Sequence, residues 1–351
     1  MIKKLDYILL DSSQLVDLIK LKKTSIISTP YFNDKFGLPF ITMHQLVEIA
    51  KIGDLNHFTL DLRTLSSCGT LYTSSPFGTR LPIHISNLFS WELDCIRKGI
   101  VSIDDLRSKF YDTIQTTYLT QDPTEIELLF EHSKGEAQAS GIVSLLNPFE
   151  FNKYRNYKPR ELTKIDFSDN EANVALAAGN KNVSDFINSR IKKKTQALEL
   201  ISSIQSSPNI TWNLIKPFSN IEDFWKNQLG KDFNPDETMD RQFERFEFHK
   251  IKDLYANQFS IDYSEVENIQ IEDTNLFRFK IENRKLLHNE LFKDKERKIE
   301  SGNEIDLDLL IFSFFMKVFT DKRTFEFVNK YLGNFPYRDN IIKAINIADA
   351  F

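Results

Sequence analysis

The chain contains little glycine and proline and almost no cysteine. Its 351 residues include 11 glycines, 11 prolines and two cysteines, Cys68 and Cys95. Because glycine and proline interrupt helices and make tight turns, their scarcity predicts long helices joined by few such turns. Two cysteines are too few for a disulfide framework or a cysteine-ligated zinc site. We therefore interpret both as reduced, incidental thiols.

Long hydrophobic runs are also missing. The longest, Leu309–Met316, is far shorter than the roughly 20 apolar residues that cross a bilayer. The amino-terminal apolar segment contains Asp6 and Asp11, which interrupt it too early for a secretory signal. We therefore expect a cytoplasmic protein with no membrane partner.

Several motifs that would identify an enzyme class are absent from the sequence. No glycine-rich phosphate loop and no Gly-x-Ser-x-Gly elbow occur, which argues against an NTPase and an α/β-hydrolase. The six histidines show no ligand spacing. The net charge of −5 argues against broad, sequence-independent binding to phosphate backbones, although it leaves room for a local basic groove.

Strand-like segments occur near the two ends of the chain. With 41% hydrophobic residues, 13% aromatic residues and 30 phenylalanines, the composition is that of a folded protein. Short apolar runs predict strands at Leu5–Leu10, Phe40–Thr42, Thr70–Thr73 and Lys317–Thr320. Apolar residues at helical spacing predict helices over Met43–Ile52, Leu55–Leu65, Ile83–Ile96, Glu304–Phe315, Lys322–Tyr331 and Ile341–Ala348.

The middle of the chain has a different pattern. From about residue 101 to residue 299 the sequence is mostly helical, and strand signals are weak. We therefore predict an α/β fold with a small central parallel sheet flanked by helices. Residues 1–100 and 300–351 would form the two parts of this core, and residues 101–299 a large, mostly α-helical insertion or second lobe.

Acidic residues stand beside the predicted strands at both ends of the chain. Asp11 follows the first strand, Glu48 lies in the helix after the second, and Asp321 follows the strand Lys317–Thr320. Asp306 lies in the acidic segment Asn303–Asp308. Mg²⁺ prefers hard oxygen ligands and keeps several waters, so a few carboxylates are enough to bind it.

These four segments resemble the acidic motifs of PIN-domain nucleases, in their large bacterial form with a helical insertion. The resemblance covers about the first 100 and the last 55 residues. It implies a PIN-like fold in which Asp11, Glu48, Asp306 and Asp321 are catalytic and hold one or two Mg²⁺ or Mn²⁺ ions. These ions would activate a water to attack a phosphodiester bond.

The same resemblance implies the function. We expect a metal-dependent endonuclease that acts on RNA in preference to DNA, as a toxin or in defence against phage. A nuclease for DNA flaps or single strands remains an alternative, because the metal chemistry is shared. A binding or scaffold protein with a degenerate nuclease core, using the helical insertion to contact a protein partner, is the other alternative.

Each acid also has a purely structural explanation. Asp11 and Asp321 are suitable helix caps, and Glu48 suits a solvated helix flank. Asp308 or Glu304 competes with Asp306 for the third ligand position, and Glu92 is a further candidate on the helix Ile83–Ile96.

Basic residues near the acids and in the middle of the chain are candidates for binding the substrate. Lys322 and Arg323 stand beside Asp321 and suit contact with the scissile phosphate. The segment Lys153–Arg160 interleaves Lys153, Arg155, Lys158 and Arg160 with tyrosines, which suits stacking on unpaired bases. A solvated linker or helix face explains the same pattern.

Overall fold

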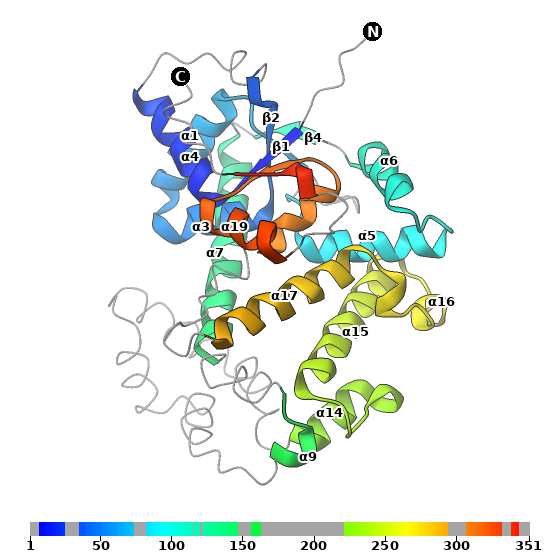
Figure 1. Cartoon of the computed structure of the whole chain (residues 1–351). Helices are drawn as coiled ribbons and strands as arrows, with labels where there is room; N and C mark the ends of the chain where they lie inside the picture. Colours follow the sequence, from blue (N-terminus) through cyan, green and yellow to red (C-terminus); the bar gives the residue numbers. More distant parts are fainter. Residues whose placement is uncertain are drawn as a thin grey trace. The chain divides into compact units, whose positions relative to one another are not determined.

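The structure is a computed structural model of the whole chain (Figure 1). It describes residues 7–24, 35–73, 82–114, 116–119, 122–146, 156–162, 221–293, 307–331 and 338–343, and the structural statements below apply to them. The chain divides into two compact units. Unit 1 comprises Met1–Lys134 and Ile251–Phe351, and unit 2 comprises Gly135–Lys250.

Unit 1 carries a six-stranded sheet of order β4-β3-β2-β1-β5-β6. The strands are β1 (Tyr7–Leu10), β2 (Leu38–Ile41), β3 (Leu71–Thr73), β4 (Thr116–Tyr118), β5 (Lys317–Phe319) and β6 (Ile341–Ile342). Strand β1 pairs in parallel with β2 on one side and with β5 on the other, so that Leu9 lies opposite both Phe40 and Val318. The central strands thus come from both ends of the chain.

The predicted α/β class and the parallel central strands are confirmed, and two edge strands were not predicted. One of them is β4, which adds an antiparallel edge to the parallel strands by pairing with β3, with Leu71 opposite Tyr118. The other is β6, which pairs with β5 and occupies the predicted start of the closing helix at Ile341; the remainder of that helix, from residue 344, lies outside the described residues. Both missed strands are only two or three residues long and form at the edges of the sheet, so their own sequence carries little signal.

Helices lie on both sides of the sheet (Figure 1). Those of unit 1 include α1 (Ser12–Thr24), α3 (Met43–Ile52), α4 (Leu55–Ser67), α5 (Ile85–Arg97), α6 (Ile103–Thr113), α16 (Ser264–Glu267), α17 (Leu276–Lys293), α19 (Lys322–Tyr331) and the 3₁₀ helices η3 (Ile271–Asp273), η4 (Leu310–Phe314) and η5 (Arg338–Asn340). Helices α7 (Pro123–Leu146) and α15 (Met239–Phe259) cross the boundaries between the units.

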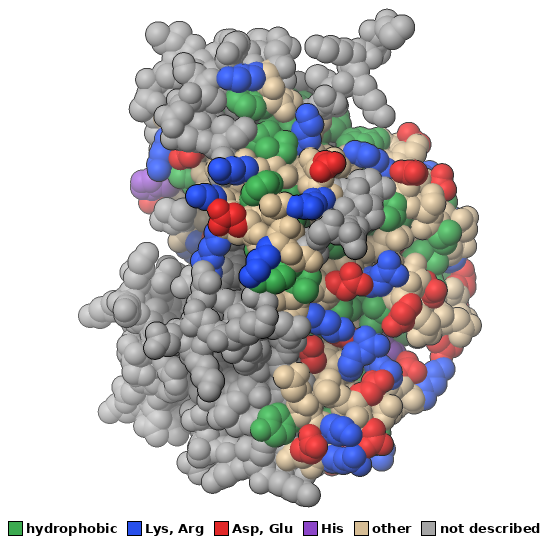
Figure 2. Space-filling view, viewed as in Figure 1, with side chains coloured by type: hydrophobic (Ala, Val, Ile, Leu, Met, Phe, Trp, Pro, Cys, Tyr) green, Lys and Arg blue, Asp and Glu red, His purple; other side chains and the backbone are tan. Residues whose placement is uncertain are grey.

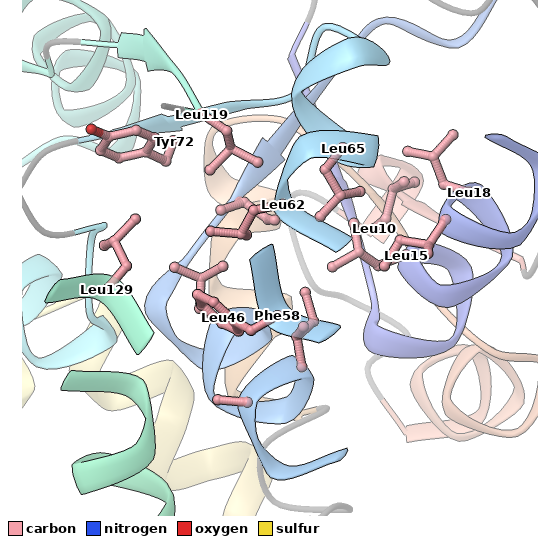
Figure 3. Close-up of a cluster of buried hydrophobic side chains, with 14 of the residues drawn as sticks. Leu10, Leu15, Leu18, Leu46, Phe58, Leu62, Leu65, Tyr72, Leu119 and Leu129 are labelled. Atoms are coloured by element: carbon pink, nitrogen blue, oxygen red, sulfur yellow. The ribbon is translucent and has the colours of Figure 1, made fainter. Parts of the chain in front are cut away.

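One face of the sheet is covered by mostly aliphatic side chains from four helices. Ile8, Leu10 and Ile41 from the strands pack with residues of α1, α3, α4 and α7 in one buried cluster. Figure 3 shows Leu10 and Leu15 beside Leu65, with Leu46 and Phe58 nearby. This packing fixes the first turns of α1 and α3 against the ends of β1 and β2.

The opposite face is aromatic. Because side chains alternate along a strand, Phe40 points away from the first cluster and lies 5.8 Å from the ring of Phe312 in η4. Behind it, the rings of Phe110 and Phe315 stack at 4.1 Å, and Trp91 meets both at 6.0 Å. Burial on both faces explains why the central strands are almost entirely apolar.

Unit 2 has its own small core. Its described helices include α9 (Pro159–Leu162), α14 (Ile221–Leu229) and the 3₁₀ helix η2 (Gly230–Asp232). Trp225 of α14 is buried, and its ring packs 5.7 Å from that of Phe246 in α15. Arg160 contacts Asp236 at 2.6 Å, and the Met239 amide donates to the Tyr157 carbonyl at 2.8 Å.

Candidate functional site

Asp11 joins the end of β1 to the start of α1. Its backbone N–H donates to the Phe319 carbonyl at 2.9 Å, which extends the pairing with β5 by one residue. Its Oδ1 atom accepts hydrogen bonds from the Gln14 amide at 2.9 Å and from the Ser13 hydroxyl at 2.8 Å. These contacts are those of a helix N-cap, and they hold the side chain in a position where only 5% of it is exposed.

Asp321 has the corresponding place after β5. It follows Thr320, whose amide donates to the Ile342 carbonyl at 3.1 Å, and it precedes α19. Its Oδ1 accepts from the Thr324 amide at 2.8 Å, and its Oδ2 accepts from the Thr324 hydroxyl at 3.0 Å. Asp321 is therefore also an N-cap.

The structure brings these two acids together. Leu10 lies opposite Phe319 in the parallel pair, so the residues after both strands emerge at the same edge of the sheet. The backbone amide and the charge of Asp321 both act on the Asp11 carboxylate. Burial raises the pKa of Asp11, the negative charge of Asp321 raises it further, and the donors from Gln14, Ser13 and Asp321 oppose this rise. A nearby cation would relieve the repulsion between the two carboxylates.

Helix α3 is tied to the same edge through Gln45. The side-chain oxygen of Gln45 accepts from the Thr42 amide at 2.7 Å and from the Thr42 hydroxyl at 2.9 Å. Its side-chain nitrogen donates to the carbonyl of Leu10, the residue before Asp11. Sequence reasoning missed Gln45, although a threonine followed three residues later by glutamine is a capping-box signal.

Glu48, predicted as a metal ligand, lies one turn beyond Gln45 in α3. Its Oε1 is 2.6 Å from Lys51 Nζ, and 32% of the side chain is exposed. The contact that the structure gives to Glu48 is thus with Lys51 and not with the two aspartates.

The third predicted motif is only partly described. Asp306 and Glu304 lie outside the described residues. Asp308 is half-buried just before η4, and its Oδ2 is 3.9 Å from Lys280 Nζ of α17. This distance is that of a loose ion pair.

Glu92 caps the start of α17. Its side-chain oxygens accept from the backbone amides of Asn275 at 2.6 Å, Leu276 at 3.0 Å and Phe277 at 3.4 Å. The side chain is completely buried, and burial raises its pKa to about 7 although the amides lower it. Its oxygens are thus occupied by the start of α17.

The basic candidates fall in both units. Lys322 and Arg323 are exposed in the first turn of α19, and Lys322 Nζ is 3.7 Å from Glu326. In unit 2, Lys158 and Arg160 contact Asp236 at 3.9 and 2.6 Å. Lys153 and Arg155 lie outside the described residues. On the described surface in Figure 2, Lys and Arg side chains lie among Asp and Glu side chains.

The oxygen atoms of the side chains at the edge of the sheet are suitable ligands for Mg²⁺ or Mn²⁺. Asp11 and Asp321 supply carboxylate oxygens, and Gln14 in the first turn of α1 has a buried side-chain oxygen without a hydrogen-bond partner. Among the described residues, no group of three or more His, Cys, Asp or Glu side chains is arranged to hold a metal ion. Mg²⁺ keeps several waters and is often held by one or two carboxylates together with substrate phosphates, so the pair fits this mode of binding.

Two findings concern the molecule as a whole. Within the described ranges, no helix combines the length and the apolar character needed to span a bilayer. Comparisons of the chain with models of protein families, with curated proteins and with solved structures found no match. The resemblance to PIN-domain nucleases therefore stays a prediction.

Proposed function

We propose that the chain is a metal-dependent endonuclease of the PIN-like type, with its active site at the carboxyl edge of the sheet in unit 1. The observation that carries the proposal is the meeting of Asp11 and Asp321, which come from opposite ends of the chain and follow two neighbouring parallel strands. Ligands of open α/β sheets bind at this edge. Capping alone explains each aspartate separately, but it does not require two like charges to lie side by side.

In this proposal the two aspartates hold Mg²⁺ or Mn²⁺. A bound divalent ion would polarise the phosphodiester and lower the pKa of a water. The protein fixes both carboxylates through the caps of α1 and α19, so their oxygens need little reorganisation when the ion binds. Burial of Asp11 strengthens its attraction for a cation, because charges interact more strongly away from water.

The remaining roles follow from position. Lys322 and Arg323, directly after Asp321, would contact phosphates of the strand. Asp306 is proposed as the third acid, with Glu304 as its alternative. Glu48 would join the site only by leaving Lys51, its partner at 2.6 Å. We propose RNA as the substrate, in preference to DNA.

Cleavage assays with Asp11→Asn and Asp321→Asn test this proposal. Asparagine is as good an N-cap as aspartate, so both variants should fold normally while losing a carboxylate. We expect wild type to cleave labelled single-stranded RNA with Mg²⁺ or Mn²⁺, and each variant to lose at least a hundredfold in rate. Single-stranded DNA in a parallel reaction tests the substrate preference.

Asp54→Asn is the matched control. Asp54 caps α4 by accepting from the His57 amide at 3.0 Å, so this variant makes the same carboxylate-to-amide change at an exposed cap elsewhere. It should keep wild-type activity. Equal cleavage by wild type and both site variants would reject the assignment.

A scaffold protein with a degenerate nuclease core is the second candidate. It is favoured by the ion pairs of Glu48 with Lys51 and of Asp308 with Lys280, because both acids already have cationic partners. Tight binding of a protein partner without metal uptake would support it.

A further inference from the structure

Two histidines meet at the starts of two helices. His44 is the second residue of α3, and His84 is the N-cap of α5. The backbone amide of Met43 donates to the Ile83 carbonyl at 3.0 Å, and this bond brings the two helix starts together. The imidazole rings consequently lie 4.6 Å apart, tilted by 30°. Both helices direct the positive ends of their dipoles towards this point.

Two lysines act on this histidine pair. The charges of Lys280 in α17 and Lys51 in α3 both act on His44. Lys280 also lies over the ring of Phe89 in α5 at 5.6 Å, which places its ammonium group beside the start of that helix. The acids facing the cluster are Asp308, at 3.9 Å from Lys280, and Glu48, at 2.6 Å from Lys51.

His44 is held neutral in this surrounding. Burial lowers the pKa of its imidazole well below the usual value, and the charges of His84, Lys280 and Lys51 lower it further. Its Nδ1 atom is buried without a hydrogen-bond partner. A buried polar atom without a hydrogen-bond partner lowers the stability of the fold. An anion bound nearby would offset the positive charges and accept hydrogen bonds from the imidazoles.

We infer that His44, His84 and Lys280 form an anion-binding site that takes a phosphate group, and that this group is a backbone phosphate of the nucleic-acid strand. Three separate elements, α3, α5 and α17, converge on the site. Gln45, the neighbour of His44, donates to the carbonyl of Leu10, the residue before Asp11, so the start of α3 links the site to the edge that carries Asp11. The identity of the ligand rests on the proposed nuclease function, whereas the anion site itself does not.

The test is a binding measurement that involves no cleavage. Imidazole signals of the whole protein are followed by NMR in EDTA while inorganic phosphate is added. We expect the signals of His44 and His84 to shift in a saturable manner, and that of the exposed His57 to serve as the internal reference. If His44 and His84 respond no more than His57, the anion site is wrong.

Variants then assign the contributing groups. Lys280→Met keeps the aliphatic stem against Phe89 and removes the charge, and His84→Asn keeps an N-cap at the start of α5 while removing the ring. Each should weaken phosphate binding at least tenfold. Lys226→Met, which removes an exposed charge from α14 in unit 2, is the control and should bind as wild type does. Unchanged affinity in both site variants would also contradict the inference.

Competition identifies the source of the phosphate. A single-stranded RNA oligonucleotide added in EDTA should displace inorganic phosphate from the histidine pair. Phosphate binding without displacement would assign the site to free phosphate and overturn the substrate role. These binding experiments need no metal, so they test the anion site separately from cleavage. If the protein binds phosphate but does not cleave RNA, the nuclease proposal is wrong and the anion site stands.

Discussion

At the residue scale, three buried acids of unit 1 differ in what surrounds the carboxylate. Asp94 accepts from Lys98 at 2.5 Å and from Tyr255 at 2.9 Å; burial acts to raise its pKa, but these donors and the positive charge of Lys98 lower it below the usual value. Glu92 is surrounded by backbone amides. Asp11 faces the like charge of Asp321. Repulsion between neighbouring carboxylates thus distinguishes the candidate site from the surroundings of Glu92 and Asp94.

Glu92 predicts a pH dependence of stability. Its pKa is about 7 in the folded protein and 4.5 ordinarily, so between these values the folded state binds more protons than the unfolded state. The contribution of protonated Glu92 to the free energy of unfolding is therefore complete below pH 4.5. It is lost as the pH rises to 7, an effect of about 3 kcal/mol. Glu92→Gln cannot ionise, so its stability relative to wild type should increase between pH 5 and pH 8. Urea denaturation at both pH values measures this change.

Glu131→Gln provides the comparison for this experiment. Glu131 is exposed on α7, and its replacement should leave the pH profile of the wild type unchanged. Parallel profiles for wild type and Glu92→Gln would show that Glu92 is ionised throughout and that the account of its burial is wrong.

The sequence predicts Asp11 and Asp321 at strand ends because each follows an apolar strand, a purely local pattern. The role of Glu92 was not visible, because it depends on where α17 starts, more than 180 residues later in the chain. The contact between His44 and His84 also depends on residues far apart in the sequence, because the backbone hydrogen bond from Met43 to Ile83 brings the two rings together. Local patterns locate strand ends, and only the tertiary structure shows which of them meet.

At the element scale, the starts of the helices position the site. Helices α1 and α19 begin with Asp11 and Asp321, and the first turn of α3 is joined to the end of β1 by Gln45. Helices α3 and α19 have the predicted bounds, Met43–Ile52 and Lys322–Tyr331, because amphipathic periodicity is strong there. Part of the helix predicted over Glu304–Phe315 is instead the 3₁₀ helix η4, whose residues are all buried. Burial on every side removes the periodicity that distinguishes helix types.

Gln45→Ala tests the link between α3 and β1. The substitution removes two hydrogen bonds from Thr42 and leaves the buried Leu10 carbonyl without this donor. We expect a loss of about 1–3 kcal/mol in the free energy of unfolding, measured by urea denaturation.

Gln270→Ala is the matched variant in η3. Gln270 also caps a helical turn, but it is exposed, so its removal should cost only a few tenths of a kcal/mol. Equal losses in the two variants would mean that the buried position of Gln45 contributes nothing.

At the scale of the whole molecule, the two ends of the chain depend on each other. Strand β1 lies between β2 and β5, so the segment around residue 318 completes the sheet that the first 73 residues begin. The apolar strand patterns at the two ends of the sequence led to the prediction of a core built from both. The sequence did not predict the extent of unit 2. Residues 101–134 and 251–293 have a mostly helical sequence pattern, and they nevertheless belong to the same unit as the sheet.

Uptake of Mn²⁺ tests the central claim most directly, that Asp11 and Asp321 form one cation site. In calorimetric titrations, wild type and Asp54→Asn should bind Mn²⁺, and Asp11→Asn and Asp321→Asn should each lose most of the affinity, at least tenfold. Because one ion would be shared, the double variant should be little worse than either single variant. Absence of Mn²⁺ uptake by the wild type, or uptake that both single variants retain, would contradict the account.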